Sequence, residues 1–232
     1  VLDLFRITPD YDLDLMRDGK DLTDITSRVI QEIRPVMTEL RPSMVLVHGD
    51  TTTAMASALA AFYARIPIAH VEAGLRTNDI YSPWPEEMNR RLVGRLATVH
   101  FAPTNTARGN LLRENCSPTA IHVTGNTVID ALLDVVRRLD ADATLAEKEA
   151  DRFSFLDPNK RTILVTGHRR ENFGSGFESI CQAILRLAAR GDVNIVYPVH
   201  LNPNVREPVS RLLHAASNIY LIEPLDYLPF AY

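Results

Sequence analysis

Apolar and polar positions switch between two periods along this chain. From residue 22 to residue 40, apolar side chains recur every three or four residues, which predicts one amphipathic helix that bends or ends near Pro35. "MVLVHGD" (44–50) is instead a continuous apolar run closed by Gly-Asp, which is typical of a strand buried on both faces. An Ala-rich stretch with helical period follows it. The chain therefore begins as a helix, a strand and a second helix.

This alternation continues to the end of the chain. Because strand and helix follow each other throughout, we expect right-handed crossovers and parallel sheets covered by helices on both faces. Residues 140–160 are polar and rich in Ala, Asp and Glu, so they are expected to join two Rossmann-like domains, 1–155 and 156–232. The remaining expected strands are "IPIAHVE", "VHFAP" and "AIHVTG" in the first domain and "RTILVTG", "NIVYPVH" and "IYLIEP" in the second.

The fold class is accordingly α/β with two parallel sheets, the second incomplete. The chain opens on Val1 rather than on Met, and it closes on "LDYLPFAY", which is typical of the start of an element. We therefore expect that both ends are cut.

Composition excludes several classes of function. The 232 residues are 46% hydrophobic and carry a formal net charge of -4 without a block of Lys and Arg, which argues against a nucleic-acid surface. Cys116 and Cys181 lie far apart and form no C-x-x-C motif, so neither a disulfide framework nor a zinc knuckle is predicted. No segment is apolar enough to span a membrane, and the N-terminal residues show no basic-then-apolar signal pattern. These features indicate a cytoplasmic protein.

Polar residues at strand ends are the first candidates for chemistry, because open parallel sheets bind ligands at the carboxyl ends of their strands. Asp50 ends "MVLVHGD"; it is either a ligand-facing carboxylate or the N-cap of the next helix. Glu72 ends "IPIAHVE", where a Glu is a poor cap and costly to bury unpaired, so we expect it to be functional.

Two further carboxylates follow in "YSPWPEEMNRR". Glu86 and Glu87 come after Pro85 in a first helical turn, where the helix dipole alone would explain them. Successive loops of one sheet, however, are expected to bring Asp50, Glu72 and Glu86 toward one crevice. Carboxylates so gathered push one another's pKa values apart, which yields an acid and a base side by side.

The second domain offers a further cluster in "GHRRENFGSG". His168 ends a predicted strand, and Arg169 and Arg170 beside it are suited to phosphate or carboxylate; the alternative is an ordinary charged loop. His200 occupies a similar place in "YPVHLNPN". The sequence contains no P-loop, dinucleotide fingerprint, H-E-x-x-H or G-x-S-x-G motif, so we expect no metal and no nucleotide cofactor of those classes.

Taken together, "VHGDTTT", "HVEAGLRT", "YSPWPEEMNRR", "TGNTVIDAL", "VTGHRRENFG" and "YPVHLNPNVREPV" resemble the bacterial non-hydrolysing UDP-N-acetylglucosamine 2-epimerases over essentially the whole chain. The resemblance implies the glycosyltransferase-B arrangement of two domains and a cytoplasmic homodimer. It implies interconversion of UDP-N-acetylglucosamine and UDP-N-acetylmannosamine for surface polysaccharides, without NAD or metal. The family's "GTRPE"-type loop and "SGG…EE" region have no counterpart here.

The resemblance also implies roles for single residues. Asp50, Glu72, Glu86 and His168 match the family's catalytic positions, and Asp50, Glu72, His168, Arg169 and Arg170 are expected to bind substrate. Arg169 and His200 fall where bacterial members bind a second UDP-N-acetylglucosamine as an activator. The alternatives are a hydrolysing epimerase, a catalytically silent binding or dimerisation module, and a glycosyltransferase on the same fold.

Overall fold

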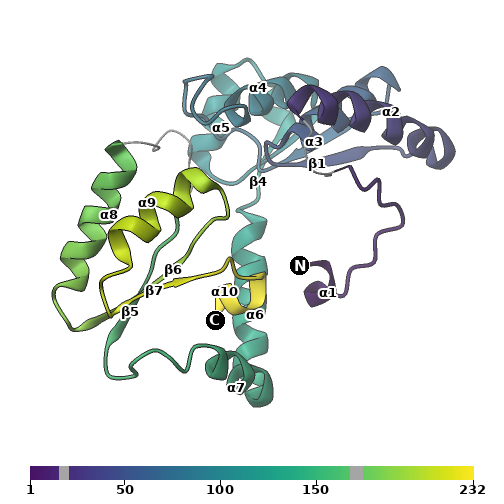
Figure 1. Ribbon diagram of the computed structural model, residues 1–232. Coiled ribbons are helices and arrows are strands. Elements are labelled where there is room, and N and C mark those ends of the chain that lie inside the picture. The colour runs from purple at the N-terminus through teal and green to yellow at the C-terminus, as the bar shows by residue number, and fades with distance from the viewer. Residues whose placement is uncertain (16–20, 168–174) are drawn as a thin grey trace. The chain divides into compact units, whose positions relative to one another are not determined.

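The computed structural model describes residues 1–15, 21–167 and 175–232, and these form an α/β protein with two parallel sheets, as predicted (Figure 1). They fall into two compact units. The first unit is Thr8–Asp130, and the second combines Val1–Ile7 with Ala131–Tyr232. This division differs from the expected 1–155 and 156–232, because most of helix α6 (Thr127–Ala141), helix α7 (Ala143–Arg152) and the first seven residues cluster with the second sheet.

The first unit is built on four parallel strands. They are β1 (Val45–His48), β2 (Ile68–Val71), β3 (Val99–Ala102) and β4 (Ile121–Val123), and they pair in sequence order. In register, His48 lies opposite Val71, which lies opposite Phe101. All four carboxyl ends consequently point to one edge of the sheet. The connecting helices are α2 (Leu22–Leu40), α3 (Thr52–Tyr63), α4 (Glu86–Leu96) and α5 (Asn105–Arg113), and a 3-10 turn (Pro118–Ala120) precedes β4.

Helix α2 is a single helix that runs past Pro35 to Leu40, so of the two expected alternatives, a bend or an end near Pro35, the end is wrong. Its start is fixed by a capping box in which Asp21 and Asp24 accept each other's backbone N–H bonds. Helix α3 explains the Ala-rich stretch of the sequence. Five of its alanines are buried, which lets the helix pack closely with α2, α4 and the sheet.

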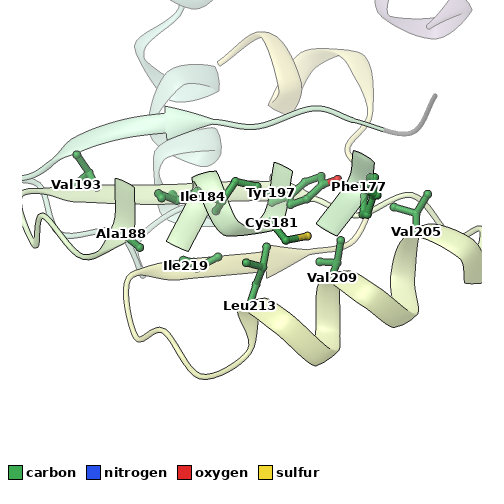
Figure 2. Packing of buried hydrophobic residues seen from close by; sticks show 11 residues of the cluster. Phe177, Cys181, Ile184, Ala188, Val193, Tyr197, Val205, Val209, Leu213 and Ile219 are labelled. Atoms are coloured by element: carbon green, nitrogen blue, oxygen red, sulfur yellow. The ribbon is translucent and has the colours of Figure 1, made fainter. Parts of the chain in front are cut away.

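The second unit contains β5 (Arg161–Leu164), β6 (Val193–Pro198) and β7 (Ile219–Ile222), again parallel and in sequence order. Figure 2 shows how helices α8 (Ser175–Ala188) and α9 (Pro203–Leu213) pack their apolar faces against this sheet. Buried positions recur every three or four residues along the helices, as amphipathic helices require, whereas β6 is buried at five consecutive residues, of which every second one belongs to this core. These residues are Phe177, Cys181, Ile184 and Ala188; Val205, Val209 and Leu213; and Val193, Ile195 and Tyr197.

The N-terminal helix α1 (Leu2–Phe5) and the C-terminal helix α10 (Tyr227–Ala231) also belong to this unit. The rings of Phe5 and Tyr227 meet edge to face with centroids 5.9 Å apart. Arg138 of α6 donates to the carbonyl of Leu4 over 2.6 Å, and its guanidinium lies over the Phe5 ring. These contacts explain why residues 1–7 cluster with the second sheet.

Candidate active site

The candidate site lies at the carboxyl edge of the first sheet, where Asp50 follows β1, Glu72 follows β2 and Asn126 follows β4. Because the strands are parallel and in register, these loops leave the sheet on the same side. Asp50, Glu72 and Asn126 are all partly buried, so each remains accessible to a ligand while it is held by neighbours.

Asp50 does not cap helix α3. The N-cap is Thr51, whose hydroxyl accepts the backbone N–H of Ala54 over 3.1 Å. The Asp50 carboxylate instead accepts from Arg90, with Nε at 2.9 Å and Nη2 at 2.6 Å from the same oxygen, Oδ2. Asn89 donates to the Asp50 main-chain carbonyl over 2.8 Å. Of the two interpretations of Asp50, capping is therefore excluded, and its side chain is held by helix α4.

Glu72 sits on a strained piece of backbone. Its φ of 66° lies in the left-handed region, which is uncommon for a residue with a long side chain and is a recurring feature of functional sites. Oε1 accepts the side-chain amide of Asn126 over 3.0 Å, and Oε2 lies 3.9 Å from Nε2 of His48. The last residue of β1 and a residue that follows β4 thus both reach the carboxylate that follows β2.

Gly49 makes room for this carboxylate. It has a φ of 72°, and a Cβ at this position would lie 3.3 Å from Glu72 Oε2, closer than most such contacts. Its carbonyl accepts a 2.8 Å hydrogen bond from Nε2 of His70, a fully buried side chain of β2. Burial lowers the pKa of His70 to about 4, so near neutral pH the ring is neutral and donates through Nε2.

Glu86 and Glu87 begin helix α4 together but have opposite surroundings. Glu87 is completely buried; it accepts the backbone N–H groups of Thr77 and Asn78 at 3.1 and 3.4 Å. It also pairs with Arg91 at 3.1 Å and with Arg90 at 3.4 Å. Burial alone would raise the pKa of Glu87, but these donors outweigh it and hold that pKa below its usual range.

Glu86, in contrast, is only partly buried, and among the described residues no hydrogen bond or ion pair reaches its carboxylate. The structure therefore joins Asp50 to helix α4 through Asn89 and Arg90, and it records no contact between Glu86 and either Asp50 or Glu72. Of the two neighbouring carboxylates, Glu87 is held by buried donors, whereas Glu86 has only its favourable place in the first turn of α4, which leaves its carboxylate available for chemistry.

The remaining expected site residues are in the second unit. His168, Arg169 and Arg170 lie outside the described residues. His200 follows β6 and is exposed, and its Nδ1 accepts the backbone N–H of Asn202 over 3.1 Å. Across the described ranges, no group of three or more His, Cys, Asp or Glu side chains is arranged to hold a metal ion, and no helix is long and apolar enough to cross a membrane.

Sequence reasoning about strand ends did not single out four residues that contact Asp50 or Glu72. Asn126 follows a strand, as Asp50 and Glu72 do, and His48 is the last residue of β1, so the search for polar residues at strand ends could have found both. Asn89 offers no such signal. Arg90 is forty residues from Asp50, and only the fold brings the two together.

Comparison with known proteins gives one consistent result. The profile of the UDP-N-acetylglucosamine 2-epimerase family matches residues 1–232. The UDP-N-acetylglucosamine 2-epimerase of Escherichia coli strain K12 is 58% identical over all of this chain, and the corresponding protein of Salmonella typhimurium is 59% identical. In both cases the chain spans 62% of the relative's length.

Solved structures agree. The UDP-GlcNAc 2-epimerase from Neisseria meningitidis, bound to UDP-GlcNAc, superposes with a TM-score of 0.95 at 48% identity and covers all of this chain, which matches 62% of the larger one. The Methanocaldococcus jannaschii enzyme, in complex with UDP-GlcNAc and UDP, gives a TM-score of 0.81 at 30% identity over 99% of this chain and 62% of the larger one. The chain therefore belongs to the UDP-N-acetylglucosamine 2-epimerase family.

Proposed function

We propose that the protein to which this chain belongs interconverts UDP-N-acetylglucosamine and UDP-N-acetylmannosamine without hydrolysing them. The observation that carries the proposal is that Asp50 and Glu72 lie at the carboxyl ends of neighbouring strands. Asp50 is held by Arg90 of α4 and Glu72 by Asn126, and the family profile matches all 232 residues of the chain. Relatives of known structure bind UDP-GlcNAc and UDP, which supports the choice of substrate.

The chemistry has to solve one problem. The C2 proton of the sugar is not next to a carbonyl, so simple deprotonation would be far too costly. Elimination avoids this. A base removes the C2 proton, the C2–H electron pair forms the C1–C2 double bond, and the C1–O bond breaks with its electrons remaining on UDP. Addition of UDP to the resulting 2-acetamidoglucal, with protonation on the opposite face, inverts C2.

The proposed groups fit these demands. Proton transfer at C2 requires two positioned groups, one on each face of the sugar, and Asp50, Glu72, Glu86 and His168 are the candidates. Each of the three carboxylates is a candidate for either role, base or acid. Arg169 and Arg170 are proposed to bind the diphosphate through their guanidinium groups, and His200 with Arg169 to bind an activating second nucleotide sugar.

We further propose, from the resemblance to bacterial relatives, that the protein works in the cytoplasm as a homodimer, needs no cofactor and supplies surface polysaccharide synthesis. Light scattering of the purified protein tests the dimer directly. Product analysis separates the proposed reaction from its nearest alternative, since a hydrolysing epimerase would release UDP and free N-acetylmannosamine.

The decisive experiment follows two labels during turnover of UDP-N-acetylglucosamine in D2O by the complete protein. Elimination and re-addition predict deuterium at C2 of the product. They also predict that 18O placed in the C1–O–P bridge scrambles into the non-bridging β-phosphate oxygens. A transient ketone with a bound hydride carrier would return the original hydrogen and leave C1–O intact. Inversion with full retention of hydrogen and no scrambling would disprove the elimination route.

A further inference from the structure

Asp50 is held by a side chain that is itself anchored in the interior of the first unit. Two guanidinium nitrogens of Arg90 lie 2.9 and 2.6 Å from Asp50 Oδ2. The third, Nη1, lies 3.4 Å from Oε2 of Glu87. The exposed fraction of the side chain decreases from 24% for Asp50 to 14% for Arg90 and to none for Glu87, which is the buried anchor of the three.

The anchor is unusually well fixed. Glu87 has partners on both oxygens: Oε1 accepts from Arg91 and from the backbone of Asn78, and Oε2 accepts from the backbone of Thr77 as well as pairing with Arg90. A buried carboxylate with this many donors has one stable position. The planar guanidinium of Arg90 contacts both Glu87 and Asp50, so the fixed position of Glu87 also fixes the position of the Asp50 carboxylate.

The two contacts of Asp50 with helix α4 act on different parts of the residue. Asn89 fixes the main chain through the Asp50 carbonyl, whereas Arg90 reaches only the side chain. Both Arg90 contacts use Oδ2, and no described residue donates to Oδ1. The arrangement thus fixes the carboxylate by one oxygen and leaves the other for a ligand.

We propose that Arg90, anchored by Glu87, is the positioning residue for Asp50: it holds one carboxylate oxygen so that the other faces the reacting sugar. This inference rests on the proposed epimerase function. It assigns Arg90 no contact with substrate and no proton transfer. A misplacement of about 1 Å can cost roughly 10²-fold in rate, and we expect a loss of that order in kcat for Arg90→Ala.

A double-mutant cycle tests whether Arg90 acts through Asp50. The wild-type protein, Arg90→Ala, Asp50→Asn and the double variant are compared by kcat and KM for UDP-N-acetylglucosamine. If Arg90 works by holding Asp50, its loss costs much less in the Asp50→Asn background than in the wild type. Equal losses in both backgrounds would overturn the inference. A wild-type protein without epimerase activity would instead overturn the proposed function, and this inference with it.

Two further measurements guard against a variant that simply misfolds. Guanidinium ion added to Arg90→Ala at low millimolar concentration should restore kcat in a saturable manner. Ammonium should not, because the cavity left by the truncated side chain matches a planar guanidinium group. Arg90→Lys keeps the charge and should retain more activity than Arg90→Ala.

Arg91→Ala is the matched control, since Arg91 contacts Glu87 but not Asp50. An Arg91→Ala loss as large as that of Arg90→Ala, without guanidinium rescue, would reduce Arg90 to a structural role.

Discussion

The side-chain amide of Asn126 donates a 3.0 Å hydrogen bond to Oε1 of Glu72. Asn126 follows β4 and Glu72 follows β2, so the bond passes across the end of β3 and ties two loops that are 54 residues apart in sequence. The oxygen of the same Asn126 amide, Oδ1, accepts the backbone N–H of Val128 over 3.0 Å, at the start of α6. One side chain therefore links the position of Glu72 to the beginning of a helix.

This double use of Asn126 allows its two roles to be separated. Asn126→Asp keeps an oxygen for the Val128 N–H but replaces the donor to Glu72 by a second carboxylate, which repels Glu72. Asn126→Ala removes both bonds. We expect both variants to lose activity, but only Asn126→Ala to lose roughly 1 kcal/mol of stability from the missing cap. Steady-state kinetics and urea unfolding check this. Full activity in Asn126→Asp would show that the Glu72 contact is unimportant for turnover.

The close approach of Gly49 to Glu72 predicts a cost for adding one methyl group. In Gly49→Ala, the left-handed backbone costs roughly 1–2 kcal/mol, and the new Cβ also pushes against Glu72 Oε2. Gly191→Ala is the matched control: its φ of 78° gives a similar backbone cost, but no atom lies within 4 Å of the new Cβ. We expect both variants to lose stability and only Gly49→Ala to lose activity. Equal kcat values for the two variants would contradict a role for the Gly49–Glu72 contact.

Glu86 and Glu87 give the sharpest pair of substitutions. Removing the charge of Glu87 leaves Arg90 and Arg91 without their buried partner, which costs roughly 3–5 kcal/mol in such ion pairs. Glu86→Gln breaks no contact in the described structure and should change stability by less than about 0.5 kcal/mol. If Glu86 transfers a proton, however, its replacement reduces kcat by roughly 10²-fold or more.

Thermal unfolding should therefore single out Glu87→Gln, whereas Glu86→Gln should lose kcat without losing stability, measured at a temperature where the variant is folded. A destabilised Glu86→Gln with normal kcat would mean that the helix dipole, and not chemistry, explains Glu86.

The sequence predicted the elements because their signals are local. Strands such as Val45–His48 and Ile68–Val71 are continuous apolar runs, and polar residues that follow them fall at one edge of any parallel sheet. This is why Asp50 and Glu72 could be chosen as candidates without a structure. The same rule would have selected Asn126.

The partners of these residues could not be predicted in this way. Whether Thr51 or Asp50 caps α3 depends on a difference of one residue in the turn, and both types are good caps. The dipole explains Glu86 and Glu87 equally well until burial separates them. The unit boundary between residues 130 and 131 is also invisible locally, because it falls inside one uninterrupted amphipathic helix.

The buried His70 predicts how stability depends on pH. Its pKa is about 4 in the folded protein and 6.5 when unfolded, so between these values the unfolded chain binds a proton that the folded chain does not. Protons therefore favour unfolding in this window: stability is complete above about pH 7 and falls as the pH is lowered toward 4. Integrated over the shift, His70 contributes a loss of about 3 kcal/mol, of which about 2 kcal/mol falls between pH 7 and pH 5. His100, which burial also shifts to a lower pKa, adds a loss of the same sign.

Urea unfolding at about pH 7 and pH 5 measures this difference directly. Glu87 and Glu114 have pKa values below their usual range, so their own losses of stability occur at lower pH and leave this interval to the histidines. His70→Gln supplies an amide that can still donate toward the Gly49 carbonyl but does not titrate, and we expect it to remove about 2 kcal/mol of the pH dependence. The same slope in His70→Gln and wild type would mean that His70 is not the titrating group.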